Sequence, residues 1–181
     1  MMKITLVRHG QTDFNYDNII QGSTNNYLND EGRRECKRLR EKLIDKHFDF
    51  CYMSPLLRTV ETAMILIGER VETATDKRLI EREMGDFEGK SRSEYDSKKY
   101  WDYNLNCGDN GVEKVQDIFA RCNDFLNYLY NRHPNESILI VSHGSPVRAF
   151  HHILNESDLN GNLLDVGIGN CYCEEIEIDD K

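Results

Sequence analysis

The sequence has little proline, no long hydrophobic stretch and no excess of basic residues. Its three prolines form no linker, and neither repeats nor low-complexity segments interrupt the 181 residues. We therefore expect one domain over residues 1–181. The longest apolar runs, at 63–67 (AMILI) and 138–141 (ILIV), are too short to cross a bilayer. The N-terminus also lacks the apolar stretch and cleavage site of a signal peptide, which predicts a cytoplasmic protein.

The net charge of the chain limits the kinds of partner that it can bind. The formal net charge is −9, with 39% hydrophobic and 30% charged residues. This composition is typical of a globular chain. Without a basic stripe, the chain is not expected to bind the backbone of a nucleic acid. A small anionic ligand remains compatible with this composition, provided that positive charge gathers locally around it.

The cysteines predict neither a disulfide framework nor a zinc site. Without a signal peptide, small buried thiols are the expected state. Cys171 and Cys173 are expected on one face of a strand, where they could contact a metal, but no partner pair with zinc spacing follows. The six cysteines are Cys36, Cys51, Cys107, Cys122, Cys171 and Cys173.

Strand and helix patterns alternate along the chain. This alternation predicts an α/β fold, a three-layer α/β/α sandwich around a mostly parallel central sheet. Ser54 and Pro55 are expected as N-cap and first helical residue of the second helix. A polar loop is expected at 11–29 and an aromatic-rich excursion at 92–111. Strands are expected at 3–8, 48–53, 71–75, 137–141 and 171–178, and helices at 31–45, 54–67, 115–129 and 145–154.

Two of the predicted strands end in a histidine followed by glycine. Arg8 and His9 follow the first strand, and His143 follows the strand at 137–141. Ligands of such folds bind at the carboxyl ends of the strands. Arg58, in the first turn of a helix, and the helix start at Ser145 add positive potential and free N–H groups. These features predict a site for an anion, most plausibly a phosphoryl group, because arginine matches its oxygens.

Two histidines beside a phosphoryl group indicate a covalent mechanism. A neutral imidazole can attack phosphorus while the second one stabilises the developing charge. The leaving alcohol needs a proton, and a carboxyl beside a phosphate suits this task because like charge favours its protonated form. The residues alone do not decide among four candidates for this acid: Glu81, Glu83, Asp86 and Glu88.

These motifs together resemble those of a known family. The segment LVRHGQT at 6–12, followed by Asn15, resembles the signature of the histidine phosphatase superfamily, the phosphoglycerate mutase-like proteins. Gln21–Gly22 resembles the next loop of that family, and SPLLRTVETA at 54–63 its second arginine segment. The acidic motif is similar at 79–89, and VSHG at 141–144 resembles the second histidine motif. The order of the motifs is that of the family.

The resemblance implies a role for each matching residue. It makes His9 the phosphorylated nucleophile, Glu81 rather than Glu83 the proton donor, and His143 a catalytic partner. It implies no metal ion or other cofactor, since arginine and histidine supply the charge. The residues expected to bind the substrate phosphate are Arg8, Asn15, Gln21, Gly22, Arg58 and the backbone amide of Gly144.

The chain departs from the family pattern at two positions. Gln11 stands where many members have Glu, and Val112 stands where a second Gly often precedes Glu113. The segment 86–112 is short, whereas family mutases carry a long insertion there. The resemblance therefore implies the compact phosphatase branch. The aromatic residues of this segment could form a lid that stacks on the substrate, or they could pack on the core; they are Tyr95, Tyr100, Trp101 and Tyr103.

The expected activity is hydrolysis of a small phosphorylated metabolite by a monomer or homodimer. The substrate could be α-ribazole 5′-phosphate, or the specificity could be broad. Two alternatives stay open, a phosphoglycerate mutase and a non-catalytic phosphate-binding module. A metal hydrolase has only the pair His151–His152 in its favour, and adjacent helical residues point about 100° apart, which makes a poor chelate.

Overall fold

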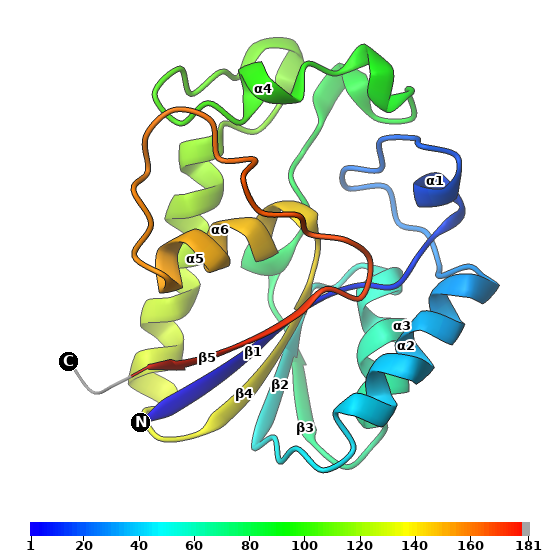
Figure 1. Ribbon diagram of the computed structural model, residues 1–181, viewed down its shortest axis with the longest axis vertical. Helices are drawn as coiled ribbons and strands as arrows, with labels where there is room; N and C mark the ends of the chain where they lie inside the picture. The colour runs from blue at the N-terminus through cyan, green and yellow to red at the C-terminus, as the bar shows by residue number, and fades with distance from the viewer. Residues whose placement is uncertain (179–181) are drawn as a thin grey trace.

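The computed structural model describes residues 1–178. Its centre is a five-stranded sheet in the order β3-β2-β4-β1-β5 (Figure 1). The first four strands in the chain run parallel, and β5 runs antiparallel to β1. The strands are β1 (Met2–Arg8), β2 (Phe50–Met53), β3 (Glu72–Thr75), β4 (Ser137–Ser142) and β5 (Cys173–Ile178).

Helices cover both faces of this sheet, as the alternation of its side chains requires. In β1 and β4, Leu6 and Ile140 join the core with α5 (Val115–Arg132) and α6 (Gly144–Leu154). Their neighbours Val7 and Val141 join the opposite core with α2 (Asp30–Lys42) and α3 (Leu57–Ile67). The two apolar layers make the predicted three-layer α/β/α sandwich, visible in Figure 1.

Register brings the two histidine segments together. β1 and β4 pair in parallel, with Arg8 opposite Ser142 at their carboxyl ends. The next residues along the two strands are His9 and His143. Neighbouring strands lie about 5 Å apart, so both histidines emerge at the same edge of the sheet.

The segment between β3 and α5 rises above this edge (Figure 1). It contains α4 (Ser97–Tyr100) and four turns of 3₁₀-helix, at Lys77–Leu79, Gly85–Phe87, Arg92–Glu94 and Asp109–Gly111. The predicted excursion is therefore ordered by short helical turns. Its chain returns to the sandwich at Val115, which is fully buried.

Four local expectations need correction. α3 begins at Leu57 with Leu56 as N-cap, so Ser54 caps no helix. α2 ends at Lys42 rather than at residue 45. The loop at 11–29 contains a short helix, α1 (Asp13–Tyr16), with Thr12 as N-cap. Cys171 has a φ of 52° and precedes β5, so it does not share a strand face with Cys173.

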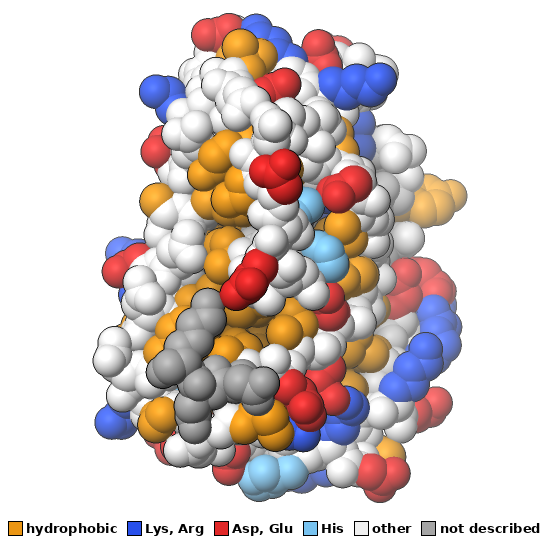
Figure 2. All heavy atoms as spheres, turned by 60° about the vertical axis from the view of Figure 1, so that its left-hand side comes forward, with side chains coloured by type: hydrophobic (Ala, Val, Ile, Leu, Met, Phe, Trp, Pro, Cys, Tyr) orange, Lys and Arg blue, Asp and Glu red, His pale blue; other side chains and the backbone are white. Residues whose placement is uncertain are grey.

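The surface agrees with the mixed charge of the chain. On the face shown in Figure 2, basic side chains are scattered among acidic ones. Among residues 1–178, no helix has the length and apolar character needed to span a membrane.

Candidate active site

His9 lies just beyond the end of β1, with only 1% of its surface exposed. Its Nδ1 is 2.7 Å from the carbonyl oxygen of Gly10. A carbonyl only accepts, so Nδ1 carries the proton and Nε2 keeps a free electron pair. Burial, together with the charges of Arg58 and Arg8, holds the pKa of His9 well below its usual value. The imidazole is therefore neutral and nucleophilic near neutral pH.

His143 is the N-cap of α6 and packs against His9, with ring centroids 5.2 Å apart. Arg58 donates from Nε to its Nδ1 over 3.2 Å, so the other nitrogen, Nε2, carries the proton. That Nε2 donates to Ser54 Oγ over 2.8 Å. Burial and the charge of Arg58 hold the pKa of His143 well below its usual value.

Arg8 brings a positive charge beside His9. Its Nη1 donates to the carbonyl of Ile168 over 2.6 Å. Its Nε is buried and has no hydrogen-bond partner among residues 1–178. Burial lowers the pKa of this guanidinium to about 10, so the group is still charged at neutral pH. A buried cationic donor without a partner is costly, and an anion would satisfy it.

Arg58 is completely buried in the first turn of α3. The loop at 22–26 holds it through the carbonyls of Gly22 and Thr24, at 3.0 and 2.6 Å, and through Asn26 Oδ1 at 3.0 Å. Burial lowers its pKa to about 10. Arg58 thus directs a fixed positive charge at His143, in a place where water does not screen it.

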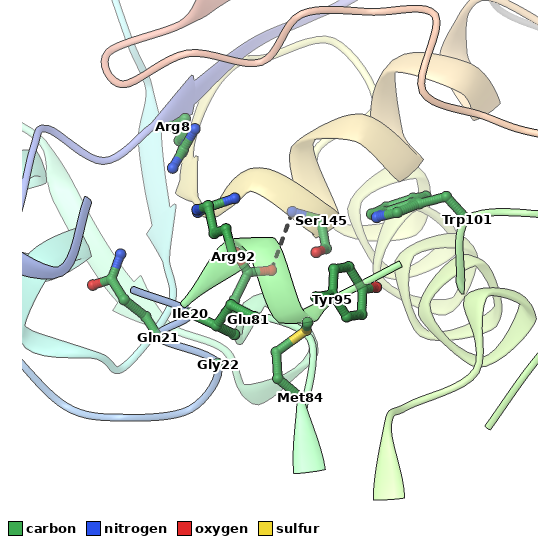
Figure 3. Close-up of a pocket in the computed structure, with 10 residues that line it drawn as sticks. All are labelled: Arg8, Ile20, Gln21, Gly22, Glu81, Met84, Arg92, Tyr95, Trp101 and Ser145. Carbon is green, nitrogen blue, oxygen red and sulfur yellow. Dashed lines mark hydrogen bonds between the residues drawn. The ribbon is translucent and has the colours of Figure 1, made fainter. Parts of the chain in front are cut away.

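The structure separates the candidate acids. The Glu81 carboxylate lies at the N-terminus of α6, where Oε2 accepts from Gly144 N and Oε1 from Ser145 N, both at 3.1 Å. Figure 3 shows this carboxylate inside the pocket. Glu83 and Asp86 are exposed. The sequence predicted that the Gly144 amide binds the substrate phosphate. In the structure this amide instead donates to Glu81.

The other predicted phosphate ligands divide into two groups. Gln21 and Gly22 line the pocket (Figure 3). Asn15 is not among the residues that line it. Its Oδ1 instead accepts from Thr12 N at 3.2 Å and from Asn170 Nδ2 at 3.1 Å, which ties α1 to the loop before β5.

The walls of the pocket combine residues that the sequence singled out with Arg92, which it did not. Figure 3 shows Arg8, Gln21 and Arg92 on one side and Tyr95 and Trp101 on the other, with Glu81 between them. Trp101 lies between two guanidiniums, with Arg82 Cζ at 5.3 Å and Arg148 Cζ at 5.2 Å from its ring centroid. The adjoining hollow adds Ser97, Gly144, Arg148, Leu164 and Ile168. The one signal for this wall was the mixture of basic and aromatic residues in the excursion.

The aromatic residues of the excursion occupy two kinds of position, in the pocket wall and in packing contacts away from it. Tyr95 and Trp101 line the pocket. Tyr100 is 2% exposed and stacks on Tyr95 at 5.0 Å. Tyr103 packs edge-on against Phe119 of α5 at 5.3 Å. Two of the four aromatics thus face the site and two anchor the segment to the rest of the molecule.

With this geometry, comparison with known proteins places the chain in a family. Residues 4–181 match the model of the histidine phosphatase superfamily (branch 1). The chain belongs to this superfamily. It is 32% identical over 159 residues to Phosphoglycerate mutase-like protein 4 of Arabidopsis thaliana, covering 82% of this chain and 69% of that one. It is 30% identical over 167 residues to Phosphoserine phosphatase 1 of Hydrogenobacter thermophilus, covering 88% and 79%.

A solved structure agrees with this placement. Bacillus stearothermophilus YhfR superposes with a TM-score of 0.88 at 26% identity, over 99% of this chain and 92% of that one. The protein is accordingly a phosphatase of the histidine phosphatase superfamily, a phosphoric monoester hydrolase.

The two departures from the superfamily pattern lie outside the pocket. Gln11 accepts through Oε1 from Asn29 Nδ2 at 3.0 Å, and its backbone N–H donates to Glu35 at 2.8 Å. Val112 is 3% exposed and forms an isolated bridge with Met84. Both residues therefore act in packing the segments around the site.

The paired histidines 151 and 152 and the other candidate metal ligands can be compared with the structure. Within residues 1–178, no three His, Cys, Asp or Glu side chains gather so that they could hold a metal ion. His151 and His152 face different partners: His151 Nδ1 is 2.8 Å from Glu174, and His152 Nε2 is 3.3 Å from the carbonyl of Leu163.

Proposed function

We propose that this phosphatase hydrolyses monoesters of small phosphorylated metabolites through a phosphohistidine on His9, without a metal ion. One observation carries the proposal. The Gly10 carbonyl fixes the His9 proton on Nδ1, so the Nε2 electron pair is free in a buried, cation-rich site. A neutral imidazole held in this way is an activated nucleophile.

In the first step, the Nε2 electron pair attacks phosphorus and the bond to the ester oxygen breaks. Arg8, whose Nε is buried without a partner, donates to a phosphoryl oxygen. Arg58 and His143 stabilise the charge on the transferring group at short range. The leaving oxygen takes the electron pair of the broken bond and a proton from Glu81.

In the second step, water attacks the phosphohistidine and Glu81 takes a proton from that water. The P–N bond breaks, its electron pair returns to His9 Nε2, and inorganic phosphate leaves. The α6 amides hold the Glu81 carboxylate in one place through both steps, over 3.1 Å each from Gly144 and Ser145. The same carboxyl group thus acts as acid and then as base.

Gln21 and Gly22 form the wall beside the substrate phosphate, and the excursion forms the opposite wall, beside the leaving group. Arg92 and Arg148 favour a leaving group that carries its own anionic or polar groups. Phosphoserine, the substrate named in one relative, fits this description. α-Ribazole 5′-phosphate would instead use the Tyr95 and Trp101 rings. Broad specificity over both classes is the third possibility.

The deciding experiment measures phosphate release from an aryl phosphate, with a chelator present, for the native protein and for His9→Ala. Release that resists the chelator and falls by about 1,000-fold in the variant is expected. His47→Ala is a matched control, since the His47 side chain is 80% exposed. Release that survives His9→Ala would overturn the mechanism. If the native protein releases no phosphate, phosphoglycerate interconversion would point to a mutase instead.

A substrate panel follows from the same assay. Phosphoserine, phosphoglycerates, nucleotides, phosphosugars and α-ribazole 5′-phosphate sample the leaving groups that the walls could accept. The single-domain organisation, the monomeric or homodimeric state and the cytoplasmic location stay predictions.

A further inference from the structure

Two cysteines that the proposed chemistry does not use lie directly behind the His9 segment. Cys36, on α2, and Cys171, in the loop before β5, have their sulfurs 3.7 Å apart, although 135 residues separate them in the chain. All six cysteines of the described chain are free thiols. Cys36 is fully buried, and Cys171 is partly exposed.

Both cysteines contact the backbone that carries His9. Cys171 donates its N–H to the His9 carbonyl over 3.2 Å. Cys36 Sγ is 3.6 Å from Thr62 Oγ1, which accepts from Gly10 N at 3.2 Å. A side chain at Gly10 would meet Cys36 Sγ at 2.8 Å. The pair therefore touches both residues of the His9–Gly10 turn.

The two thiols differ in pKa and in exposure to solvent. The hydrogen bond between Cys36 and Cys171, followed by the one that Cys36 makes with Thr62, lowers the pKa of Cys36. The same bond and burial raise the pKa of Cys171. Cys36 is thus the better thiolate, whereas Cys171 is the residue of the pair that is partly exposed to solvent. Cys171 also has a φ of 52°, an unfavourable conformation for a residue with a side chain.

We propose that Cys36 and Cys171 form a reversible dithiol switch, which a hydroperoxide closes to a disulfide that lowers the phosphatase activity. Hydrogen peroxide oxidises the sulfur of one of the two cysteines to a sulfenic acid and is itself reduced to water. The sulfur of the other cysteine then attacks that sulfenic sulfur, the S–S bond forms, and hydroxide leaves and is protonated to a second water. An external thiol restores the two cysteines by exchange.

Closure acts on the site through the chain around Cys171. The sulfurs must approach from 3.7 Å to about 2.05 Å. α2 is a 13-residue helix packed on α3, so the loop before β5 yields more readily. That loop holds the site at three points: Cys171 N binds His9, Tyr172 O accepts from Arg8 N at 3.0 Å, and Asn170 Nδ2 binds the His9 carbonyl at 3.1 Å. A displaced loop therefore moves the nucleophile and its neighbouring arginine together.

The test treats the native protein, Cys171→Ser and Cys173→Ser with hydrogen peroxide and then with dithiothreitol. Cys173→Ser is the matched control because Cys173 is an exposed thiol two residues away. We expect a peptide that links Cys36 to Cys171 in the native protein and in Cys173→Ser. In both, aryl phosphatase activity should fall at least fivefold and return with dithiothreitol. Cys171→Ser should form no linked peptide and keep its activity.

The switch rests on the proposed function, but different experimental results would contradict the switch and the proposed function. A reduced protein that releases no phosphate contradicts the proposed function, and the linked peptide still tests the disulfide. Affinity for inorganic phosphate, measured by calorimetry before and after oxidation, then reports the effect on the site. A Cys171–Cys173 link, a Cys36–Cys171 link that changes neither activity nor phosphate affinity, or equal inactivation of Cys171→Ser would overturn the switch.

Discussion

The guanidinium of Arg8 is a half-buried charge that has one buried donor unsatisfied. Its Nε has no partner in the described chain, and burial lowers its pKa to about 10. Replacing this side chain by an apolar one of similar length removes the cost of the unsatisfied buried donor. We predict that Arg8→Met raises the free energy of unfolding by about 1 kcal/mol and lowers kcat/KM on an aryl phosphate on the order of 100-fold. Urea denaturation and steady-state kinetics measure the two effects.

Arg82 provides the control for this prediction. Arg82 is completely buried, and its donors are satisfied by the carbonyls of Glu113 and Tyr100, at 2.7 and 3.0 Å. Arg82→Met leaves those carbonyls without their donors and should destabilise the fold by about 2 kcal/mol. If Arg8→Met destabilises as much as Arg82→Met, Arg8 is a structural residue and not an unsatisfied ligand.

At this same scale, some site residues could be predicted and others could not. His9 and His143 follow strands that pair in register, so two strand patterns sufficed to place them together. Ser54 looked like a helix cap but accepts a hydrogen bond from His143, a contact between residues 89 apart in the chain. The residues alone left Glu81 and Glu83 open and the family resemblance chose Glu81, whose carboxylate reaches the start of α6 in the fold.

Among the structural elements, the loop at 22–26 depends on a carboxylate from another segment. Glu88 Oε1 accepts from Ser23 N at 3.0 Å, and Glu88 Oε2 accepts from Thr24 Oγ1 at 3.4 Å. The same loop holds Arg58 through its carbonyls. We predict that Glu88→Ala raises both KM for an aryl phosphate and the inhibition constant of inorganic phosphate about tenfold, with a smaller change in kcat. Glu88→Gln should recover part of the affinity, because its amide oxygen still accepts.

Glu83→Ala is the matched control for this loop, since Glu83 is an exposed carboxylate on the same segment. It should leave both constants unchanged. Equal effects of Glu83→Ala and Glu88→Ala would mean that the negative charge of the segment, and not the hydrogen bonds of Glu88 to the loop, changes the affinity for phosphate. A fall in kcat alone would mean that Glu88 acts in the chemical step and not through Arg58.

The excursion is the element that the sequence described least well. Its polar composition predicts a surface segment, yet its turns bury Tyr100 and Trp101. These positions follow from contacts with distant residues, such as Trp101 between Arg82 and Arg148. No local periodicity encodes such contacts. Arg92 reaches the pocket for the same reason, and its place on the wall became visible only in the folded chain.

For the whole molecule, the alternation of strands and helices was sufficient for the fold class but not for the order of strands. The alternating acids of β5 are typical of a half-exposed strand, and its side chains do alternate between exposed and partly buried. Its antiparallel direction beside β1 was not encoded in that pattern. Direction and neighbour follow from how the chain returns after α6, through the 155–172 segment that also supplies Ile168 and Asn170 to the site.

The buried histidine pair makes the stability of the whole molecule depend on pH. His9 and His143 stay neutral when folded, because their pKa values lie well below the usual one. Below about pH 6.5, the unfolded chain binds a proton at each imidazole and the folded chain does not. Stability is therefore complete above about pH 6.5 and falls as the pH decreases, by about 1.4 kcal/mol per pH unit for each histidine.

Urea denaturation between pH 5.0 and 7.5 measures this slope. His9→Asn and His143→Asn should each reduce it by about 1.4 kcal/mol per pH unit, and the double variant by about twice that. His47→Asn should leave it unchanged, because the His47 side chain is 80% exposed. If neither site variant changes the slope, both imidazoles take up protons within the folded protein. The neutral nucleophile would then be absent in mild acid, and kcat/KM would fall over the same range of pH.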